Sequence, residues 1–457
     1  MKNYMKKLVT IMLTLALAGS LAACGGNGSS SSSSGSASSS KADSSVAQSS
    51  ETEESSSEAE DSSSEKEENT DAIEIAWYES TDNEDFAGAV ADAFNKANSD
   101  IQCVMVYTPQ DSYEDKMKSL LAGGGGEVDL FHSGNVAPTN LYAANGATLD
   151  LAPYLETTDL DLDNFRGRLK FATMEDGRVA GMPDGWGSWF LFYNKAIFDE
   201  AGVDYPTELT WDEYADLALE FTDHANQKWG GYYPNWTMNL YAIQQDSYLT
   251  DEDLGPTSGA LEMLNRLYNT DNSHMDIAEM VATGANPLSM FETGNVAMMI
   301  NGEWTFSQIT ADTESGANDV DWGVTFLPTP EGVAPKTGVG GVSHAAINAN
   351  SEHPDEAWKV LEFLVGPEGA SIYSVNGNLP AYITDEIAQG YIDFYDGQEF
   401  ANLPFDDGLT LIAEQGQYAR YGDVVSVFRQ NAELYLLGET TIEEFEENFA
   451  ADRDAIE

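Results

Sequence analysis

Aromatic side chains gather in segments rich in glycine, proline or asparagine, next to carboxylate and amide side chains. Trp186 lies in PDGWGSW, and Tyr233 and Trp236 lie in KWGGYYPNW. Glu303 directly precedes Trp304 in NGEW. Flat apolar rings beside oxygen acceptors suit the C–H face and the hydroxyl groups of a pyranose. A loop aromatic more often serves packing, but three such clusters favour a carbohydrate-binding surface.

Sequence patterns for catalysis and metal binding are incomplete. The stretch DLDLDN resembles the start of a calcium loop, but its sixth position is not glycine and its twelfth is Lys170. A run of four glycines lacks the Lys-Ser/Thr of a phosphate loop, and the sequence has no HExxH and no CxxC. Ser343 precedes His344 outside any G-x-S-x-G pattern. We therefore expect a binding protein rather than an enzyme, with no catalytic residue, no metal and no cofactor.

The elements that position these residues show an alternating pattern near the start of the folded region. Residues 72–78, 101–108 and 128–134 are apolar runs typical of strands. Residues 84–98 and 112–126 are predicted helices, and glycines end the second one. Strands that alternate with helices predict an α/β fold with a parallel sheet.

The ends of these strands are where a ligand is expected. Ligands of open parallel sheets bind beyond the carboxyl ends of the strands. Tyr78 and Glu79 follow the first predicted strand, and His132 and Asn135 follow the core of the third. We expect these four residues to lie near the ligand.

The chain is strongly acidic, with 78 Asp and Glu residues against 20 Lys and Arg residues and a formal net charge of −58. Such a surface repels nucleic acid and favours a neutral or cationic ligand. A polyamine or another cation, held by aromatic rings and by Glu79, Asp184 and Glu303, stays open as an alternative. A tethered carbohydrate-active enzyme or an adhesin is a second alternative, and the enzyme would need a catalytic carboxylate pair.

The N-terminal region has the pattern of an exported and anchored protein. Residues 1–23 combine a basic start with a short apolar stretch, which is typical of a secretory signal peptide. The sequence LAAC, which ends at Cys24, resembles the lipobox of bacterial lipoproteins, in which this cysteine is lipidated. Residues 24–71 are rich in serine and acidic residues and predict a disordered tether. We therefore expect Cys24 to anchor a folded domain, residues 72–457, at the extracellular face of the cell membrane of a Gram-positive-type bacterium.

Five further segments occur in a recognisable order: GRVAGMPDGWGSWFLFYNKAIFDEAGVDYPTELTWDEY, FETGNVAMMINGEWTF, DWGVTFLPTPEG, GVGGVSHAAIN and HPDEAWKVLEFLVGPEGASIYSVNGNLPA. With them, residues 72–457 resemble the extracellular solute-binding proteins of ABC sugar importers, the maltose-binding-protein-like group of family 1. The resemblance implies a two-lobed periplasmic-binding-protein-like fold of type II, with a ligand cleft between lobes that are hinged by crossing segments. It also implies a monomer that captures a carbohydrate, such as an oligosaccharide, and delivers it unchanged to a membrane permease.

The resemblance further implies lobe limits and ligand contacts. One lobe would comprise residues 72–186 and 343–390, and the other residues 187–342 and 391–457. The tryptophan of NGEW is the family's commonest stacking residue. The charged residues that maltose binders place after their first and third strands are not clearly matched here, which leaves the sugar, its length and its linkage open. The predicted ligand-binding residues are Tyr78, Glu79, Asn83, His132, Asn135, Asp184, Trp186, Tyr233, Trp236, Glu303, Trp304, Gly340 and Gly341.

Overall fold

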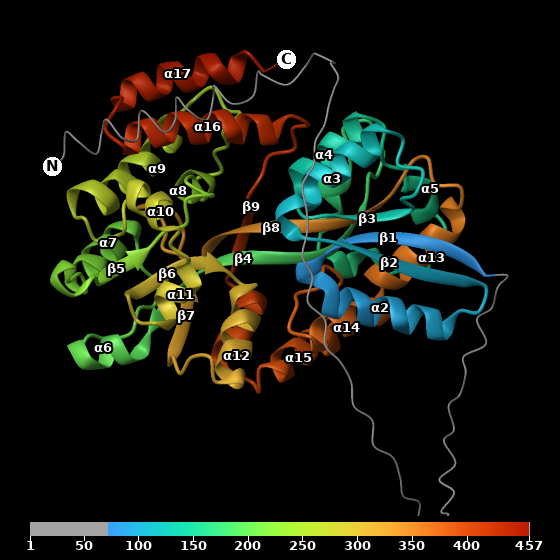
Figure 1. Ribbon diagram of the computed structural model, residues 1–457, viewed down its shortest axis with the longest axis horizontal. Helices are drawn as coiled ribbons and strands as arrows, with labels where there is room; N and C mark the ends of the chain where they lie inside the picture. Colours follow the sequence, from blue (N-terminus) through green and yellow to red (C-terminus); the bar gives the residue numbers. More distant parts are fainter. Residues whose placement is uncertain (1–71, 457) are drawn as a thin grey trace, which may run out of the picture. The chain divides into compact units, whose positions relative to one another are not determined.

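The computed structural model describes residues 72–456 (Figure 1). The predicted signal peptide, the predicted lipidation site Cys24 and the predicted tether lie outside these described residues. Within the described part of the chain, no helix has both the length and the apolar character needed to cross a membrane.

The predicted alternation of strands and helices at the start of the folded region is confirmed. The first strand pairs in parallel with the second over eight residues and also with the third. Phe86, Val90 and Phe94 share one face of the first helix and are buried against this sheet. In chain order the elements are β1 (Ile73–Ser80), α2 (Glu84–Ala97), β2 (Ile101–Thr108), α3 (Gln110–Ala122) and β3 (Leu130–Ser133).

Two long strands, β4 (Met182–Asn194) and β8 (Thr337–Ile347), connect the β1–β3 part of the fold with the part that contains β5, β6 and β7 (Figure 1). The first half of β4 pairs antiparallel with β8, and its second half pairs with strands β6 and β7. The far end of β8 pairs with β3. The strand order is β2-β1-β3-β8-β4-β6-β5, with β7 beside β4 and β9 beside β8. The remaining strands are β5 (Trp229–Tyr232), β6 (Val296–Gly302), β7 (Trp322–Phe326) and β9 (Thr410–Ala413).

Two separate hydrophobic cores lie on either side of this crossing. One core contains Trp77 and Leu130 and forms what we call lobe 1. The other contains Phe192 and Trp211 and forms lobe 2. A smaller cluster around Phe131 fills the other face of the lobe 1 sheet. The chain therefore has two lobes, each with its own core, and the predicted changes of lobe after residue 186 and after residue 342 fall inside β4 and β8.

Helices cover the sheets of both lobes (Figure 1). In lobe 1, α3 and α4 lie on one face of the sheet, and α2, α13 and α14 lie on the other. Helix α15 contributes Ile387 to the lobe 1 core and Tyr391 to the lobe 2 core. The bounds are α4 (Val136–Ala144), α5 (Ala152–Leu155), α6 (Lys195–Ala201), α7 (Trp211–Glu220), α8 (Leu240–Ile243), α9 (Gly255–Asn265), α10 (Ile277–Thr283), α11 (Pro287–Glu292), α12 (Thr305–Ser315), α13 (Pro354–Val365), α14 (Pro367–Val375), α15 (Asp385–Phe394), α16 (Tyr421–Leu436) and α17 (Ile442–Asp454).

Candidate ligand-binding site

A cavity of about 340 Å³ lies where β4 and β8 pass between the two cores. Both lobes contribute side chains to it, His132 from lobe 1 and Trp304 from lobe 2 among them. A concave site between two lobes is where a ligand loses most of its contact with water. The lining consists of Asn83, Phe86, His132, Gly134, Asn135, Gly185, Trp186, Gly187, Trp189, Trp236, Glu303, Trp304, Gly341, Ser343, Tyr373, Asn378, Leu379 and Glu414.

Glycines of the two crossing strands form part of the cavity wall. Gly187 on β4 pairs with Gly341 on β8, and we call these two residues the glycine floor. A Cβ atom on Gly187 would lie 2.8 Å from Oε2 of Glu303, closer than real Cβ contacts. A Cβ atom on Gly185 would lie 2.9 Å from Oγ of Ser343. The missing side chains therefore leave room for Glu303 and Ser343 to face the cavity.

Two tryptophans on the lobe 2 side expose large ring faces. The exposed fraction is 42% for Trp304 and 43% for Trp236, and both residues line the cavity. The ring of Trp304 meets Trp189 edge-on, with centroids 5.2 Å apart and ring planes at 82°. Gly302 makes this ring position possible, because a Cβ atom there would lie 2.0 Å from the Trp304 ring. The NGEW motif thus places an indole ring at the edge of the cavity.

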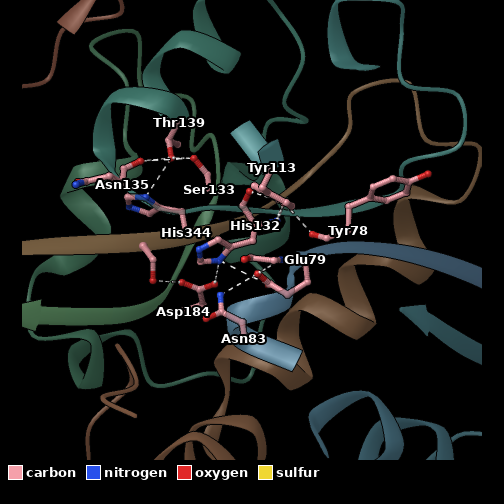
Figure 2. Close-up of polar contacts among 12 residues, drawn as sticks. Tyr78, Glu79, Asn83, Tyr113, His132, Ser133, Asn135, Thr139, Asp184 and His344 are labelled. Atoms are coloured by element: carbon pink, nitrogen blue, oxygen red, sulfur yellow. Dashed lines mark hydrogen bonds and ion pairs between the residues drawn. The ribbon is translucent and has the colours of Figure 1, made fainter. Parts of the chain in front are cut away.

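Lobe 1 contributes a buried polar cluster at the ends of β1 and β3 (Figure 2). Nδ1 of His132 lies 3.1 Å from Oδ2 of Asp184 and 3.7 Å from Oε2 of Glu79. Nδ2 of Asn83 donates to Oε1 of Glu79 at 2.9 Å. Oγ of Ser343 donates to Oδ1 of Asp184 at 2.6 Å. We call these five residues the His132 cluster, and it joins lobe 1 to both crossing strands.

The charges of the His132 cluster support one another. Burial lowers the pKa of His132, but the carboxylates of Glu79 and Asp184 outweigh burial and raise this pKa to about 9. Burial raises the pKa of Asp184, yet His132 and the hydrogen bonds from His132 and Ser343 hold it below its usual value. Burial raises the pKa of Glu79 despite the neighbouring histidine. At neutral pH His132 is therefore an imidazolium that is paired chiefly with Asp184.

Two further carboxyl groups, Glu303 and Glu414, line the cavity from lobe 2. Burial raises the pKa of Glu303 to about 8, and burial also raises the pKa of Glu414. The exposed fraction of Glu303 is only 6%. Among residues 72–456, no basic side chain contributes to the pKa of either group. The lobe 2 carboxyl groups therefore differ from Asp184, which has a cationic partner.

Residues 414–417, which follow β9, connect lobe 2 to lobe 1. Oε1 of Gln415 accepts a hydrogen bond from the backbone N–H of Ala137, in the first turn of α4, at 2.9 Å. Nε2 of Gln417 donates to a backbone carbonyl of lobe 1 at 2.6 Å. Glu414 at the start of the same segment lines the cavity. One short segment therefore contacts both the cavity and the opposite lobe.

The structure brings most of the predicted binding residues together. Glu79 and Asp184 lie directly behind the lining, where they hold His132. The predicted binding residues that line the cavity are Asn83, His132, Asn135, Trp186, Trp236, Glu303, Trp304 and Gly341.

Besides Glu79 and Asp184, three more predicted residues lie outside the cavity lining. Tyr78 points away from Glu79 (Figure 2) and packs in the smaller lobe 1 cluster, because successive strand residues face opposite sides of a sheet. Tyr233 is buried in the core of lobe 2. Gly340 allows close approach of the crossing strands, since a Cβ atom there would lie 2.6 Å from a β4 backbone carbonyl oxygen.

Several lining side chains were not predicted as ligand contacts. Trp189 belongs to the same PDGWGSW segment as Trp186, so the aromatic pattern did offer a signal. Tyr373 and Asn378 lie in a segment that carries the family resemblance. Glu414 has no local signal, because only the pairing of β9 with β8 brings it to the cavity.

Comparison with known proteins identifies the family. The family model for bacterial extracellular solute-binding proteins matches residues 79–371, which is more than half of the chain. The protein therefore belongs to the bacterial extracellular solute-binding proteins. These are binding proteins rather than enzymes, as expected from the sequence.

Individual relatives are distant. A binding protein of Brucella abortus (strain 2308) is 26% identical over 262 residues, which are 53% of this chain and 61% of that protein. The chain thus spans less than two thirds of this relative's length. An arabinooligosaccharide-binding protein of Halalkalibacterium halodurans is 24% identical over 302 residues, which are 61% of this chain and 65% of that protein.

A solved structure extends the comparison to the fold. The ABC substrate-binding protein Lmo0181 from Listeria monocytogenes, in complex with cycloalternan, superposes with a TM-score of 0.73 at 24% identity. The superposition covers 84% of this chain and 98% of that chain. The expected two-lobed α/β fold is thereby confirmed.

Proposed function

We propose that this protein binds a carbohydrate in the cavity between its lobes and delivers it, unchanged, to the membrane permease of an ABC importer. The observation that carries the proposal is the exposure of Trp304 and Trp236, 42% and 43%, inside a cavity. Exposed indole faces gain from being covered by an apolar surface, and the C–H face of a pyranose is such a surface.

The polar lining supports the same class of ligand. The lining residues His132, Asn135 and Asn378 provide donors and acceptors for hydroxyl groups. Glu303 and Glu414 provide carboxyl oxygens on the lobe 2 side. The volume of about 340 Å³ falls near the lower end of the range for small-molecule pockets, about 300–1,000 Å³. Stacking surfaces surrounded by hydrogen-bonding groups are what a sugar ring requires.

The charge of the lining argues against a phosphorylated or acidic sugar. Among the described residues that line the cavity, His132 is the sole basic side chain, and Asp184 already pairs with it. Anionic groups are normally recognised by Arg or Lys side chains that have donors to spare. A neutral or basic ligand therefore fits the cavity better than an anionic one.

An oligosaccharide is the form of sugar that we favour. A smaller cavity of about 50 Å³ shares Trp236 and Glu414 with the main one, which offers room to extend a ligand along lobe 2. The Halalkalibacterium relative is described as binding arabinooligosaccharides, and the Listeria protein holds cycloalternan. These relatives support a chain of sugars over a single sugar.

A cationic ligand such as a polyamine is the second candidate. It is favoured by the buried Glu303 and the half-buried Glu414, because carboxyl groups without a basic partner among the described residues suit a cation. Aromatic rings such as Trp304 also attract cations.

A thermal-shift screen of the purified protein against monosaccharides, oligosaccharides and polyamines tests these proposals. A ligand that binds only the folded state stabilises it by about 2.7 kcal/mol at a concentration of about 100 times its Kd. A rise in Tm with a sugar supports the proposal, whereas a rise with polyamines alone favours the second candidate. Chromatography after prolonged incubation should return the sugar intact, and degradation products would instead indicate an enzyme.

The proposed place of action is the extracellular face of the membrane, where lipidated Cys24 would anchor a monomer in a Gram-positive-type cell. The LAAC sequence supports this anchor. We expect Cys24→Ala to release the protein from the membrane fraction, as measured by fractionation and immunoblotting. A variant that stays in the membrane fraction at the wild-type level would contradict the anchor.

A further inference from the structure

The lobe 2 side of the cavity holds two carboxyl groups that have no basic partner among residues 72–456. Glu303 is 6% exposed, and among residues 72–456 its side chain has no hydrogen-bond or ion-pair partner. Glu414 lines the same cavity and is half-buried; burial raises its pKa, and the Trp189 side chain, but no basic group in the described part of the chain, lowers it. A buried carboxyl group without a partner is costly, because it loses its hydration and gains no compensating contact.

The glycine floor brings these two carboxyl groups to one spot. Oε2 of Glu303 lies 2.8 Å from the position of a Cβ atom on Gly187, and Oε2 of Glu414 lies 3.5 Å from that on Gly341. Gly187 and Gly341 are directly opposite each other in the β4–β8 pair, so such Cβ positions are about 4.5–5.5 Å apart. A ligand group that lies on the floor is therefore within reach of both carboxyl groups.

The lobe 1 side of the cavity does not balance this charge. His132 is the sole basic group among the described lining residues, and its charge is matched by Asp184 and Glu79. Arg168 lies behind the lining, 4.2 Å from the centroid of the Trp186 ring. Counting it, Glu79, Asp184, Glu303 and Glu414 still outnumber the basic residues His132 and Arg168. Burial raises the pKa of Glu303 to about 8, so this carboxyl group is largely protonated at neutral pH, and a cation beside it would favour its ionised form.

We propose that the bound sugar carries a basic amino group, which lies on the glycine floor between Glu303 and Glu414. This proposal rests on the carbohydrate function proposed above. An ammonium group has three donors and a positive charge, so it satisfies two carboxylates at once. A hydroxyl group has one donor and no charge, so it satisfies only one of the two carboxyl groups. Trp304 then stacks on the sugar ring, and the nearby aromatic face also favours the cation.

Calorimetric titration of the full chain with matched sets of sugars tests this proposal. Each set holds a 2-amino sugar, its N-acetyl form and the parent sugar, for the gluco, galacto and manno series and for their disaccharides. We expect the amino form to bind about tenfold or more tightly than both neutral forms in at least one set. Neutral forms that bind as tightly as, or more tightly than, the amino form in every set would overturn the proposal.

The same titrations separate failure of this proposal from failure of the carbohydrate function. Neutral sugars that bind without a preference for the amine leave the carbohydrate function intact and overturn only the amino-sugar proposal. If spermidine binds and none of the sugars does, both the carbohydrate function and the amino-sugar proposal are overturned.

A pair of variants locates the preference. In Glu303→Gln, which keeps the size and removes the charge, the affinity ratio of amino to neutral sugar should fall about tenfold or more. Glu331→Gln removes the same charge at an exposed residue outside the cavity and should leave the ratio unchanged. An unchanged ratio in Glu303→Gln, with circular dichroism showing a folded protein, would overturn the proposal.

Discussion

On the lobe 1 side of the cavity His132 lies 3.1 Å from Asp184, and Asp184 in turn accepts a hydrogen bond from Ser343. On the lobe 2 side Glu303 has no partner within the described residues, and Trp304 is 42% exposed. The lobe 1 side pairs its charged groups with one another, although Oε2 of Glu79 accepts no hydrogen bond. The lobe 2 side leaves the Glu303 carboxyl group without a partner among the described residues and the face of Trp304 uncovered.

This difference separates what stabilises the protein from what binds the ligand. Groups in the His132 cluster gain their hydrogen bonds on folding, so their loss should lower stability. Groups on the lobe 2 side gain partners only when a ligand arrives, so their loss should lower affinity while leaving the free protein stable. The His132 cluster is thus already formed in the free protein, whereas the lobe 2 side of the cavity is completed by the ligand. This arrangement fits a movement of the lobes toward each other when the ligand binds.

The largest expected effect is that of Trp304→Ala on affinity. Removing a stacking surface at a binding site costs about 2–4 kcal/mol, or roughly a 30- to 1,000-fold rise in Kd. The Tm of the ligand-free protein should change little, because the ring is already half exposed. Calorimetric titration and thermal unfolding measure the two effects.

Trp211→Ala is the matched control for this prediction. Trp211 is 1% exposed in the lobe 2 core, so its truncation should lower the free energy of unfolding by about 3–5 kcal/mol. If Trp304→Ala instead lost stability like Trp211→Ala and kept its affinity, the distinction between the two sides of the cavity would fail.

The second prediction concerns the pH dependence that His132 gives to stability. The pKa of His132 is about 9 in the folded protein against an ordinary value of about 6.5, since Glu79 and Asp184 outweigh burial. A raised pKa gives stability that is fully present below about pH 6.5 and is lost as the pH rises through about 9. Between pH 6.5 and 9 the free energy of unfolding of the wild type, measured with urea, should therefore fall by roughly 1–3 kcal/mol more than that of His132→Gln.

His224→Gln serves as the control, because His224 is exposed on the surface of lobe 2. It should follow the wild-type pH profile. Parallel profiles of wild type and His132→Gln would contradict the role assigned to the His132 cluster.

The smallest expected effect is that of Gln415→Ala on closure. This variant removes the hydrogen bond from the Ala137 N–H across the lobes, and one such bond is worth about 0.5–1.5 kcal/mol. We expect the affinity for the ligand to fall about 2- to 12-fold, on the premise that the ligand-bound form keeps this contact between the lobes and an open form loses it.

Small-angle scattering supplies the structural readout for this variant. Saturating ligand should reduce the radius of gyration of the wild type, and Gln415→Ala should need more ligand for the same change. Gln245→Ala removes a hydrogen bond within lobe 2 and should behave as wild type. A wild-type profile that stays unchanged when calorimetry shows bound ligand would indicate a rigid site instead of a clamp.

The sequence determined those features that depend on local patterns. Apolar runs separated by an amphipathic helix predicted β1, α2 and β2, because burial repeats with the period of each element. The rule that ligands bind beyond strand ends led to His132 and Asn135, which both line the cavity. The position of Trp304 followed from the NGEW segment, where Gly302 leaves space for the ring.

Only the tertiary structure decided which neighbouring residues face the cavity. Tyr78 and Glu79 are adjacent in sequence, yet one packs in a core cluster and the other joins His132, because a shift of one residue along a strand reverses the side. Glu414 reaches the cavity through the pairing of Ala413 with Gly340, residues far apart in the chain. Such pairing depends on how two distant surfaces fit together, and no local pattern records that fit.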